Sequence, residues 1–182
     1  IAGRNIPARR LSGDYFDFIE MPGGRFGAVI ADVSGKGMPG ALITVMCRTL
    51  LRAAALGNIS PSAALASLNR SIAPDMREDM FVTVSYLTLQ NGSPSITLAR
   101  AGHTDALVWR KSTGKVESFR PPGMGVGIDD SGTVFERVTK DATIAMEPGD
   151  CLLLFTDGVN EALNLQGDEF GEVRNKKALA RL

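Results

Sequence analysis

Short runs of alternating apolar and polar residues near the start of the chain predict a β-hairpin. Residues 15–20 and 26–33 alternate loosely and are rich in β-branched and aromatic side chains, as strands are. A Pro-Gly-Gly sequence at 22–24 separates them and is typical of a turn. Because the open ends of an antiparallel hairpin meet, we expect Asp14 and Asp17, at the start of the first strand, to neighbour Asp32, near the end of the second.

A long apolar stretch comes next and predicts two consecutive helices. Residues 41–56 form the first, with Pro39 in its first turn. Apolar residues cover so wide an arc of this helix that we expect it to be mostly buried. Ser60 and Pro61 are typical of a helix N-cap and first position, and they predict a second helix that ends near Ile72.

The remaining pattern is mostly that of strands joined by short turns. We expect strands at 80–89, 96–99, 107–110, 115–119, 134–138 and 151–155, and a final helix at 170–182. Short turns favour antiparallel sheets, and two consecutive helices do not fit the alternation of a βαβ fold. The chain is therefore expected to be a single α+β domain over residues 1–182.

Composition narrows the classes of function. Lys plus Arg and Asp plus Glu number 20 each, so the formal net charge is zero, which argues against nucleic acid as a partner. The single histidine, His103, excludes a His-rich zinc site. Cys47 and Cys151 stand in apolar runs and are expected to be buried thiols in a reducing compartment. No uninterrupted apolar run reaches the roughly 20 residues of a membrane span.

Three aspartates at predicted strand ends are candidate metal ligands. Asp14, Asp32 and Asp157 each stand beside a glycine or a turn, and Asp17, close to Asp14, is a fourth candidate. Mg²⁺ and Mn²⁺ prefer oxygen ligands, and converging carboxylates repel one another unless cations lie between them. Two such ions about 3.5–4 Å apart clamp a phosphate and ionise a water. Aspartate before glycine is also ordinary turn chemistry, so the prediction depends on the three residues together.

Two further polar residues keep two interpretations each. Lys36 is placed to reach a phosphate, but a lysine between glycines is as often solvated. His103 is either a general acid or a structural residue of a turn.

The Gly-x-Gly-x-x-Gly sequence at 35–40 resembles a dinucleotide-binding fingerprint. That fingerprint needs an acid about 20 residues further on, and none occurs between Asp32 and Asp75.

Four short motifs in register resemble the SpoIIE/RsbU-type branch of the PPM (protein phosphatase 2C-like) family. They are Ser-Gly-Asp-Tyr-Phe-Asp at 12–17, Ala-Asp-Val-Ser-Gly-Lys-Gly at 31–37, Ala-Gly-His at 101–103, and Phe-Thr-Asp-Gly at 155–158 with Glu-Ala at 161–162. The resemblance implies an αββα sandwich, in which two antiparallel sheets are flanked by helices. It also implies two Mn²⁺ or Mg²⁺ ions at one edge, and hydrolysis of phosphoserine or phosphothreonine by a metal-bridging hydroxide.

The resemblance also assigns roles by motif position. Asp32 would bridge both ions, and Asp157 would bind the first. Asp14, directly or through a water, and the backbone carbonyl of Val33 would serve the second ion. The supporting residues would be Asp17 in an outer-shell role, with Gly35, Lys36 and Gly158.

The same resemblance implies partners and a setting for the protein. The substrate would be a phosphorylated STAS-type anti-sigma-factor antagonist, a sensor or receiver domain would precede this domain, and a homodimer is compatible with it. The location would be cytoplasmic, or the cytoplasmic part of a membrane-anchored sensor. The alternative is a catalytically inactive scaffold of the same fold that binds a regulatory protein.

One departure from the family pattern concerns the ends of the chain. The family continues into a strand with an Asp-Asp pair that binds the first ion, whereas this sequence stops at Leu182. It also begins at Ile1 without a methionine. We therefore expect a domain truncated at both ends, with an open first metal site.

Overall fold

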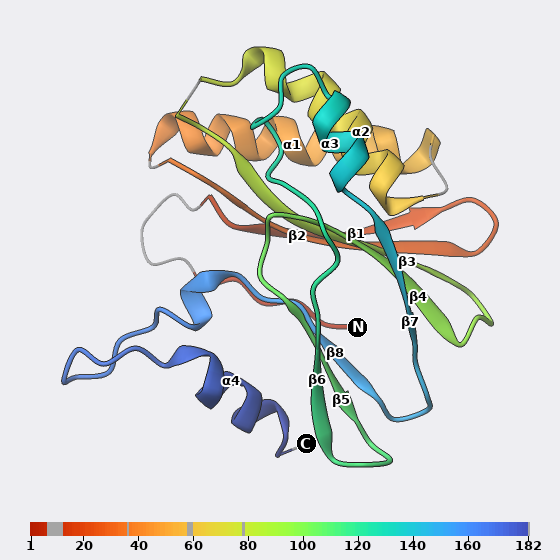
Figure 1. Ribbon diagram of the computed structural model, residues 1–182, viewed down its shortest axis with the longest axis vertical. Helices are drawn as coiled ribbons and strands as arrows, with labels where there is room; N and C mark the ends of the chain where they lie inside the picture. Colours follow the sequence, from red (N-terminus) through yellow and green to blue (C-terminus); the bar gives the residue numbers. More distant parts are fainter. Residues whose placement is uncertain (7–12, 36, 58–59, 78, 182) are drawn as a thin grey trace. The chain divides into compact units, whose positions relative to one another are not determined.

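The computed structural model describes residues 1–6, 13–35, 37–57, 60–77 and 79–181 (Figure 1). The chain folds as two compact units, which are described separately below. The first unit comprises Ile1–His103 with Pro121–Ala145, and the second comprises Thr104–Arg120 with Met146–Leu182. The single-domain interpretation of the sequence stays a prediction.

The first unit contains a five-stranded antiparallel sheet in the order β1-β2-β3-β4-β7. The strands are β1 (Tyr15–Met21), β2 (Arg25–Val33), β3 (Val82–Gln90), β4 (Ser95–Ala101) and β7 (Asp141–Ala145). The hairpin of β1 and β2 confirms the first prediction from the sequence, to within one residue at each strand end. The sequence pattern did not predict β7, which pairs with β4 at the edge of the sheet.

Two helices lie side by side over one face of this sheet (Figure 1). They are α1 (Met38–Gly57) and α2 (Pro61–Ile72), and the short 3₁₀ helix η1 (Ala73–Asp75) follows α2. The Ser60 side chain accepts a hydrogen bond from the N–H of Ala63 at 3.3 Å, which confirms the predicted N-cap. The core lies between helices and sheet, and alternate strand residues such as Tyr15, Ala31 and Val84 point into it.

The expectation that α1 is mostly buried is wrong. Ile43 and Cys47 on its inner face are buried, but Leu42 and Val45 on its outer face are 59% and 64% exposed. The helix has the length and apolar composition of a membrane span, yet it packs here against β1 and β2. A helix that covers a sheet buries only the stripe turned towards the sheet, so the apolar residues outside that stripe stay exposed.

The strand expected at 134–138 is also wrong, because this segment is helix α3 (Thr133–Val138). The Asp129 carboxylate accepts hydrogen bonds from the backbone N–H of Phe135 at 2.8 Å and from the Ser131 hydroxyl at 2.7 Å. These bonds satisfy a donor at the start of the helix. Phe135 is fully buried in the core, so the helix is held by a capping side chain and by one apolar anchor.

The second unit contains a three-stranded antiparallel sheet in the order β6-β5-β8. Its elements are β5 (Ala106–Arg110), β6 (Lys115–Phe119), β8 (Cys151–Leu153), the 3₁₀ helix η2 (Asp157–Val159) and α4 (Gly171–Leu179). Leu107, Phe155 and Leu179 form its buried core, which joins α4 to the sheet. Antiparallel sheets combined with helices confirm the predicted α+β class.

Candidate metal centre

The pairing of β1 with β2 places Asp14 opposite Asp32. Tyr15 is the partner of Ala31 in this antiparallel ladder. Extending the same register by one pair brings Asp14 and Asp32 face to face, with both side chains on one face of the sheet. The proximity that the hairpin predicted from sequence is therefore confirmed for these two aspartates.

Gly13 extends the pairing of β1 with β2 by one more residue, and its hydrogen bond shows which kind of cross-strand pair Asp14 and Asp32 form. The Gly13 carbonyl accepts hydrogen bonds from the N–H of Val33 and from the Thr44 hydroxyl, both at 3.3 Å. Pairs in an antiparallel ladder alternate, so the aspartates next to this bonded pair occupy a non-hydrogen-bonded position. Cα atoms in such positions are about 4.5 Å apart, and the side chains approach closely.

The absence of a side chain at position 13 leaves room for two oxygen ligands. A Cβ atom on Gly13 would lie 2.7 Å from the Val33 carbonyl oxygen and 3.4 Å from Oδ1 of Asp32. These two oxygens and the Asp14 carboxylate make a hard, anionic donor set of the kind that Mg²⁺ and Mn²⁺ prefer. The donors that this edge of the sheet supplies therefore fit the metals that the sequence implies.

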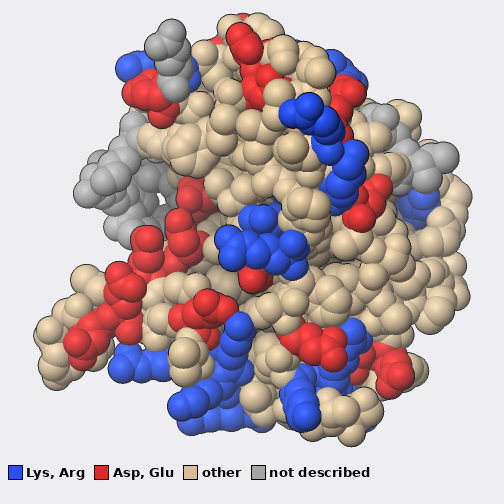
Figure 2. Space-filling model, in the orientation of Figure 1, with Lys and Arg blue, Asp and Glu red and all other residues tan. Residues whose placement is uncertain are grey.

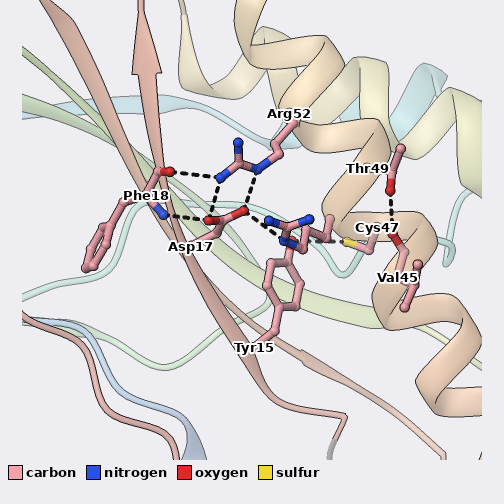
Figure 3. A network of polar contacts seen from close by, with 8 residues as sticks. Tyr15, Asp17, Phe18, Val45, Cys47, Thr49 and Arg52 are labelled. Carbon is pink, nitrogen blue, oxygen red and sulfur yellow. Dashed lines mark hydrogen bonds and ion pairs between the residues drawn. The ribbon is translucent and has the colours of Figure 1, made fainter.

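Asp17 lies on the other face of β1, turned towards α1 (Figure 3). Its carboxylate accepts two hydrogen bonds of 2.7 Å from Arg52 and forms a 3.1 Å ion pair with Arg48. The bonds from Arg52 lower the pKa of Asp17 below its ordinary value. Positions an odd number of residues apart on a strand face opposite sides, so Asp17 binds α1 and not the oxygens around Asp14. The resemblance implied that Asp17 supports the metal site from an outer shell, whereas the structure shows that its carboxylate binds the arginines of α1.

The loop after β2 turns the chain from Asp32 into α1. The N–H of Ser34 donates to the Phe81 carbonyl at 2.9 Å, and the N–H of Phe81 donates to the Ser34 hydroxyl at 2.7 Å. Gly35 then adopts φ = 107°, which side chains disfavour, and this explains the glycine there. Lys36 lies outside the described residues, and its predicted supporting role stays a prediction.

His103, which the sequence left with two interpretations, is buried in the first unit with 5% of its surface exposed. Its Nδ1 lies 2.8 Å from Oγ1 of Thr83. Thr83 pairs with Asp32 across β2 and β3, and its hydroxyl donates to the Asp32 carbonyl at 3.4 Å. Sequence analysis missed Thr83, since only the register between two strands distant in sequence places it beside Asp32.

Comparison with known proteins now adds to this geometry. Residues 22–182 match the family model described as Stage II sporulation protein E (SpoIIE). The chain belongs to the SpoIIE family. The predicted resemblance to the SpoIIE/RsbU branch of the PPM phosphatases is thereby confirmed.

Relatives and solved structures agree with this assignment. The phosphoserine phosphatase RsbU of Bacillus subtilis is 29% identical over 167 residues, which cover 92% of this chain and 48% of RsbU. The RsbU and RsbW domains of Rv1364c from Mycobacterium tuberculosis superpose with a TM-score of 0.77 at 22% identity, covering 97% of this chain and 47% of that one. The PP2C phosphatase domain of SpoIIE from Bacillus subtilis, with a fragment of its regulatory domain, gives 0.77 at 18% identity, covering 94% and 49%. The two structures show that the fold is shared.

The third predicted ligand of this SpoIIE-family chain, Asp157, belongs to the second unit. It begins η2 and has an exposed side chain, and its carbonyl accepts from the N–H of Glu161 at 2.9 Å. Gly158 follows it in the same turn. The segment 157–172 contains acidic residues and no Lys or Arg, and Figure 2 shows acidic side chains gathered along it.

The gathering of all three aspartates stays a prediction. Asp14 and Asp32 lie in the first unit and Asp157 in the second. Within the described parts of the chain, the structure shows no group of three or more His, Cys, Asp or Glu residues that could hold a metal ion. The structure shows the juxtaposition of Asp14 and Asp32 in the first unit, with the Val33 carbonyl beside them, and the role of these residues as metal ligands stays a prediction.

Proposed function

We propose that this chain is the catalytic domain of a metal-dependent phosphatase that hydrolyses phosphoserine or phosphothreonine in proteins. The observation that carries the proposal is the cross-strand pair of Asp14 and Asp32, with the Val33 carbonyl at the space beside Gly13. Like charges directly opposite each other destabilise a sheet, and a bound cation offsets that cost. Membership of the SpoIIE family and similarity to a phosphoserine phosphatase support the choice of reaction.

Each residue has a defined part in this proposal. Asp32 and Asp14 hold the cations together with the Val33 carbonyl, and Asp157 supplies a carboxylate for the first ion. Bound Mn²⁺ or Mg²⁺ supplies positive charge that offsets the phosphate anion and promotes ionisation of a water nucleophile. Gly13 keeps the space beside these oxygens open, because any side chain there would meet the Val33 carbonyl.

The proposal extends to the substrate and to the whole protein. A phosphorylated STAS-type protein is the proposed substrate, and the cytoplasm is the proposed location. The chain spans about half the length of RsbU, and in the proposal a sensor or receiver domain regulates this catalytic domain. Similarity to a phosphoserine phosphatase supports a phosphorylated substrate, and the STAS-type partner, the regulatory domain and the location rest on the resemblance of the sequence motifs.

The test uses the full-length protein with Mn²⁺, a generic aryl phosphate and a phosphoserine-containing STAS protein. The wild type is expected to release phosphate from both substrates. Asp32→Asn is expected to lower kcat/KM by about 100-fold or more, since changes to residues that only support ligands already cost about 10- to 100-fold. Asp79→Asn is the matched control, because Asp79 is 70% exposed in a surface ion pair, and it should leave the rate unchanged.

An inert wild type would overturn the proposal. If full-length protein releases no phosphate with Mn²⁺ or Mg²⁺ but still binds the STAS protein, the chain is a scaffold with a phosphatase fold. Equal rates for the wild type and Asp32→Asn would place the activity outside this site.

A further inference from the structure

The polar residues next to Asp32 form a connected chain that reaches a buried histidine. Alternate residues of β2 and β3 point away from α1 and α2, and Asp32 and Thr83 are paired at such positions. The Thr83 hydroxyl lies 3.4 Å from the Asp32 carbonyl and 2.8 Å from Nδ1 of His103. One hydroxyl thus joins the imidazole to the peptide that carries the candidate ligand.

The Thr83 hydroxyl makes two contacts of different length, to the Asp32 carbonyl and to the His103 ring. A threonine hydroxyl has one proton and two lone pairs. The Asp32 carbonyl can only accept, so Thr83 is the donor in the 3.4 Å contact. The direction of the 2.8 Å bond between Thr83 and His103 depends on which tautomer of the imidazole is present.

His103 is itself held by its surroundings. Its carbonyl accepts a 2.6 Å hydrogen bond from Nη1 of Arg100, which is 8% exposed and also donates to the Pro121 carbonyl at 3.0 Å. Gly102 has φ = 71° and pairs with Val84, which bends the chain so that the next residue meets Thr83. The backbone that carries the imidazole is thus held by contacts that do not depend on the Thr83 bond.

Electrostatic repulsion tends to displace Asp32 from its place in the sheet. Asp32 stands near the end of β2, opposite the like charge of Asp14, and the two carboxylates repel each other. On its other side, Asp32 faces Thr83 of β3. The hydrogen bond from Thr83 opposes displacement of the Asp32 peptide. Because the Val33 carbonyl belongs to the next peptide along the strand, the same bond helps to hold that carbonyl in place.

We propose that Thr83 and His103 are positioning residues, which act in series to hold Asp32 and the Val33 carbonyl in the geometry that binds the cation. This inference rests on the proposed function, because it concerns the same metal site. Neither residue is proposed to touch the substrate or the reacting atoms. Removing the hydroxyl is expected to weaken cation binding without unfolding the protein, as the loss of a partner of a metal ligand does.

The test measures Mn²⁺ binding directly in the full-length protein. Free Mn²⁺ is followed by its electron paramagnetic resonance signal during titration with Mn²⁺ alone. Thr83→Val is nearly isosteric and is expected to raise the Mn²⁺ dissociation constant about 10-fold, whereas Thr83→Ser keeps the hydroxyl and should bind within about twofold of the wild type. Thr88→Val, towards the other end of β3, is the control and should change nothing.

A double-variant cycle tests the connection to the histidine. His103→Leu is expected to weaken Mn²⁺ binding as much as Thr83→Val does, and the double variant no more than either alone, because residues in one chain of contacts are not additive. Circular dichroism and thermal unfolding confirm that each variant is folded. If His103→Leu fails to fold, the comparison of Thr83→Val with Thr83→Ser still decides the role of the hydroxyl.

The outcomes separate this inference from the proposed function. A wild type that binds Mn²⁺, with a Thr83→Val variant of equal affinity, overturns the positioning role and leaves the phosphatase proposal standing. Fully additive losses in the double variant show that the two residues act separately, which also overturns it. A wild type that binds no Mn²⁺ overturns both proposals.

Discussion

Leu42 and Leu51 lie on the same helix in opposite environments, since Leu51 is 1% exposed and Leu42 is 59% exposed. Their separation of nine residues corresponds to about two and a half turns of α1, which puts the two side chains on opposite sides of the helix. Leu51→Ala is expected to lower the free energy of unfolding by about 2–5 kcal/mol, and Leu42→Ala by no more than about 0.5 kcal/mol. Urea denaturation of both variants measures the difference. Equal losses would mean that another surface covers the outer face of α1 in solution.

Gly13→Ala should disturb the candidate metal centre through backbone contact. The added Cβ would lie 2.7 Å from the Val33 carbonyl oxygen, which forces the end of β2 to shift. We expect a loss of about 1–3 kcal/mol in stability, as in other overpacked sites, together with weaker Mn²⁺ binding. Gly57→Ala is the control, because nothing lies within 4 Å of an added Cβ there. Unchanged Mn²⁺ affinity in Gly13→Ala would show that the space beside Gly13 is not needed.

The ion pairs of Asp17 predict a dependence of stability on pH. Bonding to Arg52 lowers the pKa of Asp17 below the ordinary value of 3.8. A carboxylate with a lowered folded-state pKa stabilises the fold above its unfolded pKa, and this contribution is lost as pH falls through the folded pKa.

Asp17→Asn is therefore expected to be less stable than the wild type by about 1–2 kcal/mol at pH 7, between the values for exposed and buried ion pairs. The difference should persist down to about pH 4 and shrink below it. Urea denaturation from pH 3 to pH 7 measures it. A constant difference over this range would assign the loss to packing and not to charge.

Cys47 should react with thiol reagents much more slowly than Cys151. Cys47 is fully buried beside the Tyr15 hydroxyl, and burial raises the pKa of its thiol to about 11. The thiolate is the reactive form, so Cys47 reacts at pH 8 only when the fold opens. Cys151 is partly exposed. In a Cys151→Ser variant, the Cys47 thiol should react with Ellman's reagent at a rate that rises with the fraction of unfolded protein. A fast reaction of the native protein would contradict the burial of Cys47.

Features decided by neighbouring residues could be predicted from sequence. The turn at 22–24 sets the register of β1 against β2, and that register alone brings Asp14 opposite Asp32. The start of α2 follows from Ser60 and Pro61 in the same way. In both cases the physical cause is a hydrogen bond or a backbone restriction between residues close together in the sequence, so the local sequence is enough to predict it.

Features decided by distant segments could not be predicted. The sequence of 134–138 suits a strand as well as a helix. It is a helix because Phe135 packs into a core built by elements far away in the sequence, in addition to the local hydrogen bond to Asp129. Asp17 stood in a motif with Asp14, yet the arginines of α1 determined its contacts.

The sequence by itself determined the hairpin that pairs two carboxylates, the chemistry of that pair and the family of the chain. The tertiary structure decided which face of α1 is buried and which partners Asp17 and Asp32 have. Thr83 stands beside Asp32, and His103 beside Thr83, only because segments far apart in sequence are neighbours in the sheet. Hydrogen bonds and burial depend on what packs against a residue, and local sequence does not specify that neighbour.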